Sequence, residues 1–224
     1  MTTINDPSTT AVLIGHTNDP DPVPVYWDPS RDGHISVEGE LAAGRSTTAT
    51  KIAAAFLSGQ PNPRVIVFTQ SRTPYVPFLV HDPRVTLATT RRQTDDAIQA
   101  IQAELDSRYE HIDRTLAHPA DRILVIVDGD RAPNPSFFKN ILRIGRSAGI
   151  HLLRVHHHDP DFAYGEARYN FGTNVHLRDT TETAKLLYDE QLATAVAELP
   201  HGKAIVVPAP GPEKPCTIIN PEEI

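Results

Sequence analysis

Residues 34–46 read His34-Ile-Ser-Val-Glu-Gly-Glu-Leu-Ala-Ala-Gly-Arg-Ser46, and this stretch decides the fold. Its first five residues predict a short strand, and the segment bounded by Gly39 and Gly44 predicts a tight loop. From Ser46 to Leu57 the apolar side chains recur at helical spacing, which predicts a helix. A strand, a glycine-bounded loop and a helix in direct succession make up one α/β unit.

The rest of the chain repeats this alternation. Residues 95–118 form the clearest helical pattern, because apolar side chains recur every three or four positions until Pro119. Residues 122–127 are the most hydrophobic run and are typical of a buried parallel strand. Further strands are predicted at residues 11–15, 25–27, 64–69, 85–88, 150–155, 174–177, 204–207 and 216–219, and further helices at 135–148 and 181–199. We therefore predict an α/β fold with a mostly parallel sheet and helices on both of its faces.

Composition limits the class of protein. The chain has 224 residues, of which 39% are apolar, and this is enough to build a sizeable core. A single cysteine, Cys216, excludes a disulfide framework and fits a reducing compartment. The sequence has neither an apolar run of membrane-spanning length nor a signal peptide. We therefore expect a soluble cytoplasmic protein.

Acidic residues are concentrated at the start of the chain. Residues 1–40 contain seven acids and one base, whereas the whole chain has a net charge of −7. We expect residues 1–22 to be a flexible acidic segment and residues 23–224 to form the folded domain. Because residues 41–224 are nearly neutral, a basic chromatin-type protein is excluded. Any contact with nucleic acid requires arginines gathered on one face.

The loop after the strand predicted at residues 34–38 has the spacing of a phosphate-binding loop, G-x-x-x-x-G-K-[ST], with Arg45 in place of the lysine. Backbone N–H groups of such a loop, together with the positive end of the helix, can surround a diphosphate, and the Ser46 hydroxyl can bind Mg²⁺. The predicted nucleotide-binding residues are Gly39, Glu40, Leu41, Ala42, Ala43, Gly44, Arg45, Ser46 and Thr47. The alternative is an ordinary strand–turn–helix corner. Arg45 is not equivalent to lysine, because guanidinium binds phosphate as a wide planar fork.

An acid follows the most hydrophobic strand. Asp128 stands where such ATPases place the carboxylate that holds Mg²⁺-bound water, so Ser46 and Asp128 are the predicted metal-binding pair. The next position, which usually carries the glutamate that polarises the attacking water, is Gly129, with Asp130 one residue further on. The alternative is a turn that closes a buried strand. We expect the 39–46 loop and Asp128 to face each other across adjacent strands.

Several segments, taken in order, are similar to the FtsK/SpoIIIE DNA-translocase family of the FtsK–HerA P-loop ATPases, including its conjugative-transfer and type VII secretion branches. The most specific is Gly145-Arg-Ser-Ala-Gly-Ile-His-Leu-Leu153, which resembles the stretch before the family's sensor strand. The other similar segments are residues 23–28, 33–37, 104–109 and 174–204. The resemblance implies a RecA/FtsK-like P-loop NTPase fold that binds ATP and Mg²⁺. It also implies a homo-oligomer, a ring such as a hexamer or a filament, that acts on double-stranded DNA.

The chain departs from this family at three positions around the terminal phosphate. Arg45 replaces the lysine, Gly129 replaces the catalytic glutamate, and His157 replaces the γ-phosphate-sensing glutamine. The resemblance therefore leaves Asp128, Asp130 and His157 as the catalytic candidates of a degenerate member. Each lost charge at such a centre costs roughly 10²–10³ in rate, so slow or absent ATP hydrolysis is expected.

Two functions follow. The first is an FtsK-like motor-type domain of DNA translocation, transfer or segregation, with weak or absent ATP hydrolysis. The alternative is a non-catalytic assembly or adaptor module, a pseudo-ATPase that partners an active ATPase or a secretion or conjugation apparatus. A kinase-like P-loop enzyme is a weaker third interpretation, since the sequence has no lid segment. Basic candidates for gripping DNA or for an arginine finger are Arg91, Arg92, Arg131, Arg143, Arg146 and Arg154.

Three consecutive histidines, His156, His157 and His158, end one predicted strand. Successive side chains of a strand alternate between its faces, so at most the first and third share one face. A metal site and a polar loop at the sheet edge are the two alternatives, and the spacing of the residues favours the loop.

Overall fold

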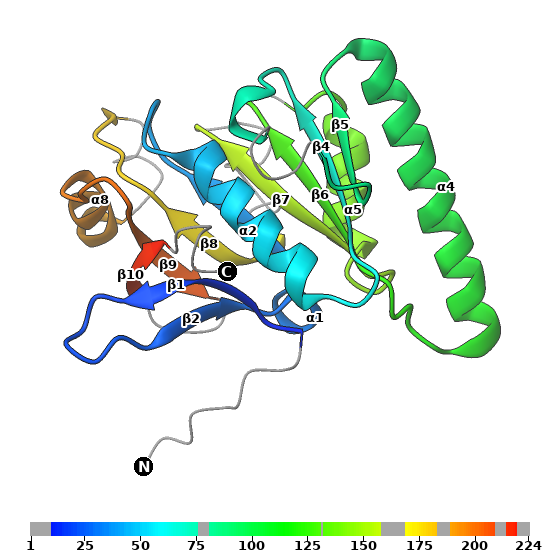
Figure 1. Cartoon of the computed structure of the whole chain (residues 1–224), viewed down its shortest axis with the longest axis horizontal. Coiled ribbons are helices and arrows are strands. Elements are labelled where there is room, and N and C mark those ends of the chain that lie inside the picture. Colours follow the sequence, from blue (N-terminus) through cyan, green and yellow to red (C-terminus); the bar gives the residue numbers. More distant parts are fainter. Residues whose placement is uncertain are drawn as a thin grey trace.

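The computed structural model describes residues 10–75, 81–130, 132–157, 169–182, 189–208 and 214–218. Within these ranges one ten-stranded sheet runs through the molecule in the order β2-β1-β10-β9-β8-β3-β7-β6-β4-β5, with helices packed against it (Figure 1). The strands are β1 (Val12–Thr17), β2 (Pro24–Trp27), β3 (His34–Glu38), β4 (Arg64–Thr69), β5 (Val85–Ala88), β6 (Ile123–Asp128), β7 (Ile150–His156), β8 (Phe171–His176), β9 (Lys203–Pro208) and β10 (Lys214–Ile218). The helices are α1 (Pro29–Asp32), α2 (Arg45–Gly59), α4 (Arg91–Thr115), α5 (Pro135–Ile144) and α8 (Glu190–Ala197), with a 3₁₀ turn, η1 (Thr73–Tyr75).

The sheet has a parallel part and an antiparallel part. Strands β8, β3, β7, β6, β4 and β5 run parallel, and β9, β10, β1 and β2 continue the sheet beyond β8 in antiparallel pairs. Within the described ranges, α2 lies in the crossover from β3 to β4, α4 in that from β5 to β6 and α5 in that from β6 to β7, as the alternating pattern predicts. The mostly parallel α/β architecture is confirmed.

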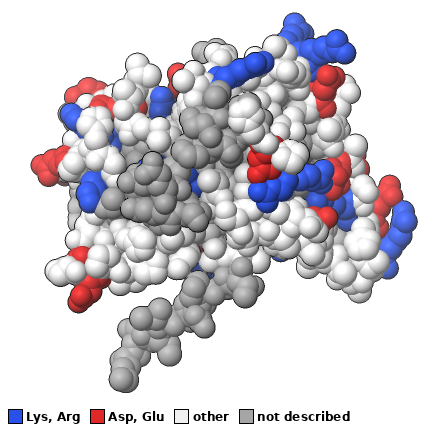
Figure 2. Space-filling model, in the orientation of Figure 1, with Lys and Arg blue, Asp and Glu red and all other residues white. Residues whose placement is uncertain are grey.

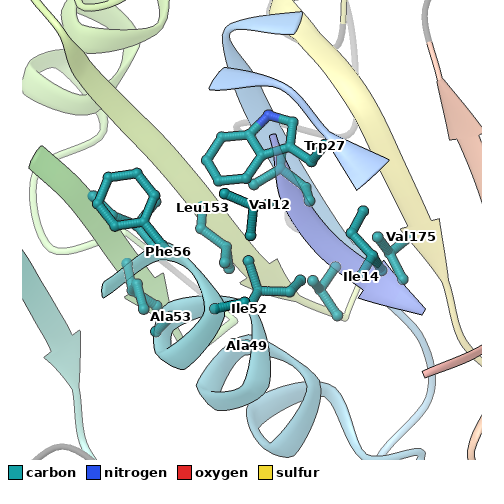
Figure 3. Close-up of a cluster of buried hydrophobic side chains, with 14 of the residues drawn as sticks. Val12, Ile14, Trp27, Ala49, Ile52, Ala53, Phe56, Leu153 and Val175 are labelled. Atoms are coloured by element: carbon teal, nitrogen blue, oxygen red, sulfur yellow. The ribbon is translucent and has the colours of Figure 1, made fainter. Parts of the chain in front are cut away.

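Helices cover both faces of the parallel strands. On one face α2 buries Ile52, Ala53 and Phe56 against β7 and against β1 and β2, where Trp27 stacks at 6.2 Å from Phe56 (Figure 3). On the other face α4 and α5 pack apolar side chains, among them Leu105 and Phe138, against β6 and β7. None of the helices in the described ranges has the length and apolarity needed to cross a membrane.

Some elements differ from the prediction. The segment 1–22, expected to be flexible, contains β1, which belongs to the sheet because Val12 and Ile14 are buried in the core. The long helix begins at Arg91 rather than residue 95, since Thr90 and Gln93 form a capping box, and it ends before Leu116. The turn at 28–33 contains the short helix α1. Of the helix predicted over 181–199, residues 190–197 form α8, while residues 183–188 lie outside the described ranges.

Two buried histidines hold the amino ends of β3 and β7 together. The Leu152 N–H donates to His34 Nδ1 at 2.9 Å, and His151 Nδ1 lies 2.8 Å from the Gly33 carbonyl oxygen. Burial lowers the pKa of His34 to about 4, an effect that the Leu142 carbonyl opposes. Burial, with a contribution from His34, lowers the pKa of His151 to about 3. Both rings are therefore neutral at pH 7.

These histidines predict acid sensitivity. Between pH 6.5 and pH 4 the unfolded chain binds protons at His34 and His151 that the folded chain does not. The free energy of unfolding therefore falls as the pH falls, by about 1.4 kcal/mol per pH unit for each histidine. His151→Asn should remove one such contribution from the slope measured by urea denaturation over this range. An unchanged slope would contradict the assignment.

A close approach of α1 to β8 gives a second prediction. A Cβ on Gly172 would lie 1.8 Å from the Asp32 carbonyl oxygen, so Gly172→Ala should lower the free energy of unfolding by about 2–3 kcal/mol. The matched control is Gly59→Ala, whose Cβ would meet only the Ala11 carbonyl oxygen at 4.0 Å. Equal urea midpoints for the two variants would show that α1 can move away from β8 without cost.

Candidate nucleotide site

The loop between β3 and α2 ends on the N-terminus of α2. Gly44 is the N-cap with φ +94°, a left-handed conformation that suits glycine, and it makes no side-chain hydrogen bond. The Thr48 N–H donates the first helical bond, to the Gly44 carbonyl at 2.9 Å. The N–H groups of Arg45, Ser46 and Thr47 therefore have no acceptor within the helix. Together with the helix dipole they can bind an anion.

The first half of this loop is anchored to the segment that follows β8. The Glu40 N–H donates to the Arg178 carbonyl at 3.0 Å, and the Glu40 carboxylate accepts from the Thr180 N–H at 3.1 Å and hydroxyl at 2.6 Å. These hydrogen bonds from Thr180 lower the pKa of Glu40. Leu41, at the tip, is 84% exposed. Of the nine predicted nucleotide-binding residues, Glu40 thus has its carboxylate committed to Thr180 and Leu41 projects into solvent.

Asp128 ends β6 at the carboxyl edge of the sheet, beside Thr69 of β4 and Val155 of β7. Its Oδ2 accepts a hydrogen bond of 2.8 Å from the Tyr75 hydroxyl. Tyr75 is completely buried, and burial, reinforced by the Asp128 charge, raises the pKa of its phenol well above the usual value. The phenol therefore stays protonated and donates to Asp128.

Tyr75 is a site residue that the sequence analysis missed. It lies in η1, which is tied to α2 by a hydrogen bond of 3.1 Å from the Thr50 hydroxyl to the Pro74 carbonyl. A single turn of 3₁₀ helix produces no periodic pattern, so no sequence signal linked it to Asp128. The only hint was a tyrosine beside a proline near the end of β4.

The phosphate-loop motif and the acidic motif converge. Arg45 Nη1 lies 3.6 Å from Asp130 Oδ1, and the Arg45 side chain is only 14% exposed while that of Asp130 is 73% exposed. One expectation was wrong in detail: β7 lies between β3 and β6, so the loop and Asp128 are not on adjacent strands. Arg45, which extends from the start of α2, spans this gap.

The Asp128 Oδ1 atom accepts no hydrogen bond from the described residues, so it can accept one from Mg²⁺-bound water. Asp128 Oδ1 and the Ser46 hydroxyl at the start of α2 are oxygen ligands of the kind that a hard cation such as Mg²⁺ prefers. The described residues contain no group of three His, Cys, Asp or Glu side chains that could hold a metal. His158 lies outside the described ranges.

The histidines at the end of β7 lie beside the base of the loop that follows β3. His156 Nε2 lies 3.6 Å and His176 Nδ1 3.7 Å from the carboxylate of buried Glu38. His157 Nε2 lies 4.0 Å from Asp179 Oδ2. The structure therefore brings Arg45 and Asp130 together, two residues from Asp128, and it places His157 beside Asp179, between the two residues that anchor Glu40.

The predicted basic residues separate into three groups. Arg154 is fully buried and donates to the carbonyls of Val127 and Val155, each at 2.7 Å, so its assignment to a DNA-gripping surface was wrong. Arg91, Arg92, Arg143 and Arg146 are exposed, and Arg131 lies outside the described ranges. On the face drawn in Figure 2, basic and acidic side chains are interspersed.

A scan against models of known protein families finds no match, and a search of curated proteins finds none either. Solved structures share the fold. EssC (ATPases 2 and 3) of Geobacillus thermodenitrificans superposes with a TM-score of 0.75 at 14% identity, over 95% of this chain and 44% of that one. EccC (ATPases 2 and 3) of Thermomonospora curvata, in complex with a signal sequence peptide, gives 0.74 at 16% identity, over 93% and 40%.

A third match is the monomer of the pCW3 conjugation coupling protein TcpA with ATPγS, at a TM-score of 0.66 and 12% identity, over 97% of this chain and 68% of that one. The chain thus spans less than half the length of the EssC and EccC structures. At these identities the likeness concerns the fold, and it confirms the predicted RecA/FtsK-like P-loop NTPase architecture.

The Tyr75–Asp128 contact predicts a measurable stabilisation. Tyr75→Phe leaves the partly buried carboxylate without its donor and should lower the free energy of unfolding by about 1–2 kcal/mol at pH 7. Tyr109→Phe is the matched control, because it removes a hydroxyl that donates to the Ile144 carbonyl at 2.6 Å, far from this edge. If Tyr75→Phe also raises the affinity for Mg²⁺, measured by calorimetry with ATP present, the phenol competes with the metal's water for Asp128. An unfolding free energy equal to that of the parent would contradict the contact.

Proposed function

We propose that this chain is a nucleotide-binding, motor-type domain of the FtsK–HerA kind, involved in DNA translocation, transfer or segregation, with weak or absent ATP hydrolysis. The observation that carries this proposal is the convergence of the loop after β3 with the acids after β6, in which Arg45 lies 3.6 Å from Asp130. Two motifs about 80 residues apart in the sequence meet at one edge of a P-loop-type sheet. Such an edge is where ligands bind in open α/β sheets.

Each group at this edge has a role toward ATP. The unpaired N–H groups at the start of α2 would hold the phosphates, while Ser46 and Asp128 would hold Mg²⁺ and its water. Bound Mg²⁺ would neutralise phosphate charge. To reach a phosphate, Arg45 has to leave Asp130, so ATP and Asp130 compete for the same guanidinium.

Hydrolysis is expected to be slow because none of the described side chains stands where the family's catalytic glutamate would orient the attacking water. Gly129 supplies no carboxylate, and Asp130 is engaged by Arg45. His157, the predicted phosphate sensor, is directed toward Asp179. With roughly 10²–10³ in rate lost for each such group, turnover approaches the uncatalysed level.

Partners and location follow from the proposal. The matching structures include the cytoplasmic domain of a type VII secretion ATPase and a conjugation coupling protein, which supports a place in a secretion or conjugation apparatus. A homo-oligomer is part of the same proposal. Double-stranded DNA, a partner ATPase and a cytoplasmic location belong to the same proposal. The proposed domain extends beyond residues 23–224 to include β1, which completes the sheet.

The alternative is a non-catalytic assembly or adaptor module. One specific observation favours it: Arg45 and Asp130 neutralise each other, and Tyr75 binds Asp128, so the site is electrostatically satisfied without a nucleotide. Binding of a fluorescent ATP analogue with Mg²⁺ separates the two functions. Saturable binding that Arg45→Ala weakens supports the nucleotide-binding domain, whereas no binding at millimolar concentration supports the adaptor.

Restoring the missing groups tests the degenerate site. Arg45→Lys combined with Gly129→Glu should raise the ATPase rate by at least about tenfold, because it supplies the point charge and the water-orienting carboxylate. Gly129 has φ +152°, which strains other residues, so Gly129→Gln with Arg45→Lys is the control that carries the same strain without the carboxylate. Equal rates for the two double variants, measured by phosphate release, would mean that the site cannot be repaired at these positions.

A further inference from the structure

A cavity of about 580 Å³ lies at the opposite edge of the sheet from Asp128. Its walls are the junction of α1 with β3, the end of α5 with the turn after it, and the start of β8. His34, in its wall, begins β3, whereas the phosphate loop follows the end of that strand. A five-residue strand separates the cavity from the candidate nucleotide site by roughly 15 Å. The cavity is therefore a separate site.

The charge of the cavity is positive. Arg31 and Asp32 neutralise each other, with Nε 2.7 Å from Oδ1, and the buried Asp32 carboxylate also accepts from the Asp28 N–H at 3.0 Å. Arg143 and Arg146 form no ion pair with any residue in the described ranges. Because burial keeps His34 neutral at pH 7, these two arginines leave the cavity with two uncompensated positive charges.

Arg146 is held in place at the rim. Its Nη1 donates to the Arg31 carbonyl at 3.4 Å, and its stem packs over Gly33, where a Cβ would lie 3.2 Å from Arg146 Cδ. The absence of a side chain at Gly172 lets β8 approach the Asp32 carbonyl of α1 closely. This close approach sets the position of α1, which forms one wall of the cavity. A guanidinium positioned in this way loses little entropy when it binds a ligand.

An aromatic ring completes the rim. Tyr169 lines the same cavity and is 89% exposed, so its ring is accessible to a ligand. Arginine pairs bind phosphate oxygens, and an exposed ring stacks on a nucleobase. The two features on one cavity match a ligand that has both a phosphate and a planar base.

We propose that this cavity binds one nucleotide unit, with its phosphate on Arg143 and Arg146 and its base stacked on Tyr169. The volume suits a ligand of this size. A free mononucleotide and one residue of a nucleic-acid strand present the same chemistry, so either can be the source. This site is independent of ATP binding by the 39–46 loop.

The experiment measures fluorescence anisotropy of a labelled single-stranded oligonucleotide of about 12 residues with the full chain, and uses AMP as the competitor. AMP is chosen because it lacks the β- and γ-phosphates that a phosphate loop holds. Arg143→Gln with Arg146→Gln should weaken binding at least about tenfold. It should also lower the salt dependence, the slope of log K against log salt, by about 0.7, the value for one lost phosphate contact on a single strand.

The matched control is Arg84→Gln with Arg114→Gln, which removes the same charge from two arginines whose side chains are 45% and 74% exposed and which lie outside the cavity. It should change the affinity by less than about twofold, whereas Tyr169→Ala should weaken it about fivefold or more. All these side chains are exposed, and circular dichroism verifies the fold of each variant.

Each outcome supports or overturns the proposal that the cavity binds a nucleotide unit. If AMP displaces the strand and shows the same loss in the Arg143/Arg146 variant, the source is a free nucleotide. If the strand binds far more tightly than AMP, with the same loss, the source is nucleic acid. Equal losses in the two arginine pairs, wild-type binding by Tyr169→Ala, or no saturable binding of either probe would overturn the proposal.

Discussion

The placement of β3 between β7 and β8 is the constraint on which the rest of the structure depends. All five residues of β3 are buried, and parallel pairing on both sides fixes its register, with Glu38 opposite His156 and His176. Because the pairing is parallel, the carboxyl ends of β3, β7 and β8 lie at the same edge of the sheet. The loop after β3 is therefore positioned by the centre of the sheet and by its anchor at Thr180.

The same placement explains why the edge is so polar and yet stable. Buried charge is costly unless it is paired or hydrogen-bonded. Glu38 lies within 4 Å of two histidines and accepts from the Ser36 hydroxyl at 3.0 Å, and Arg154 donates to two carbonyls. Arg45 and Asp130 form the outermost pair, where one side chain is largely covered and the other is exposed. A ligand can separate this outer pair more easily than the others, because the exposed Asp130 carboxylate is then solvated by water and no buried carboxylate is left unpaired.

The sequence predicted what depends on local periodicity. The alternation of apolar runs located the parallel strands and α4, and glycine spacing located the loop at 39–44. It did not predict properties that depend on strand order, such as β7 between β3 and β6, because order is set by packing between distant segments. Tyr75 was missed since a 3₁₀ turn has no period, and Arg154 was misplaced because a charged residue within an apolar strand looks like surface until the register is known. The role of His157 as a phosphate sensor rested on family resemblance and on its place at the carboxyl edge of the sheet. That role stays a prediction, and the structure places this residue 4.0 Å from Asp179.

The order of the strands has a consequence for how the protein is made. β1, near the N-terminus, pairs with β2 and with β10, the last strand of the described chain, and β10 in turn pairs with β9. The hairpin of β1 and β2 therefore cannot join the sheet until the ribosome has released residue 218. At roughly 5–20 residues per second, the hairpin waits some tens of seconds with the β10-facing backbone edge of β1 unpaired. During translation, that edge is the surface that a nascent-chain chaperone would encounter.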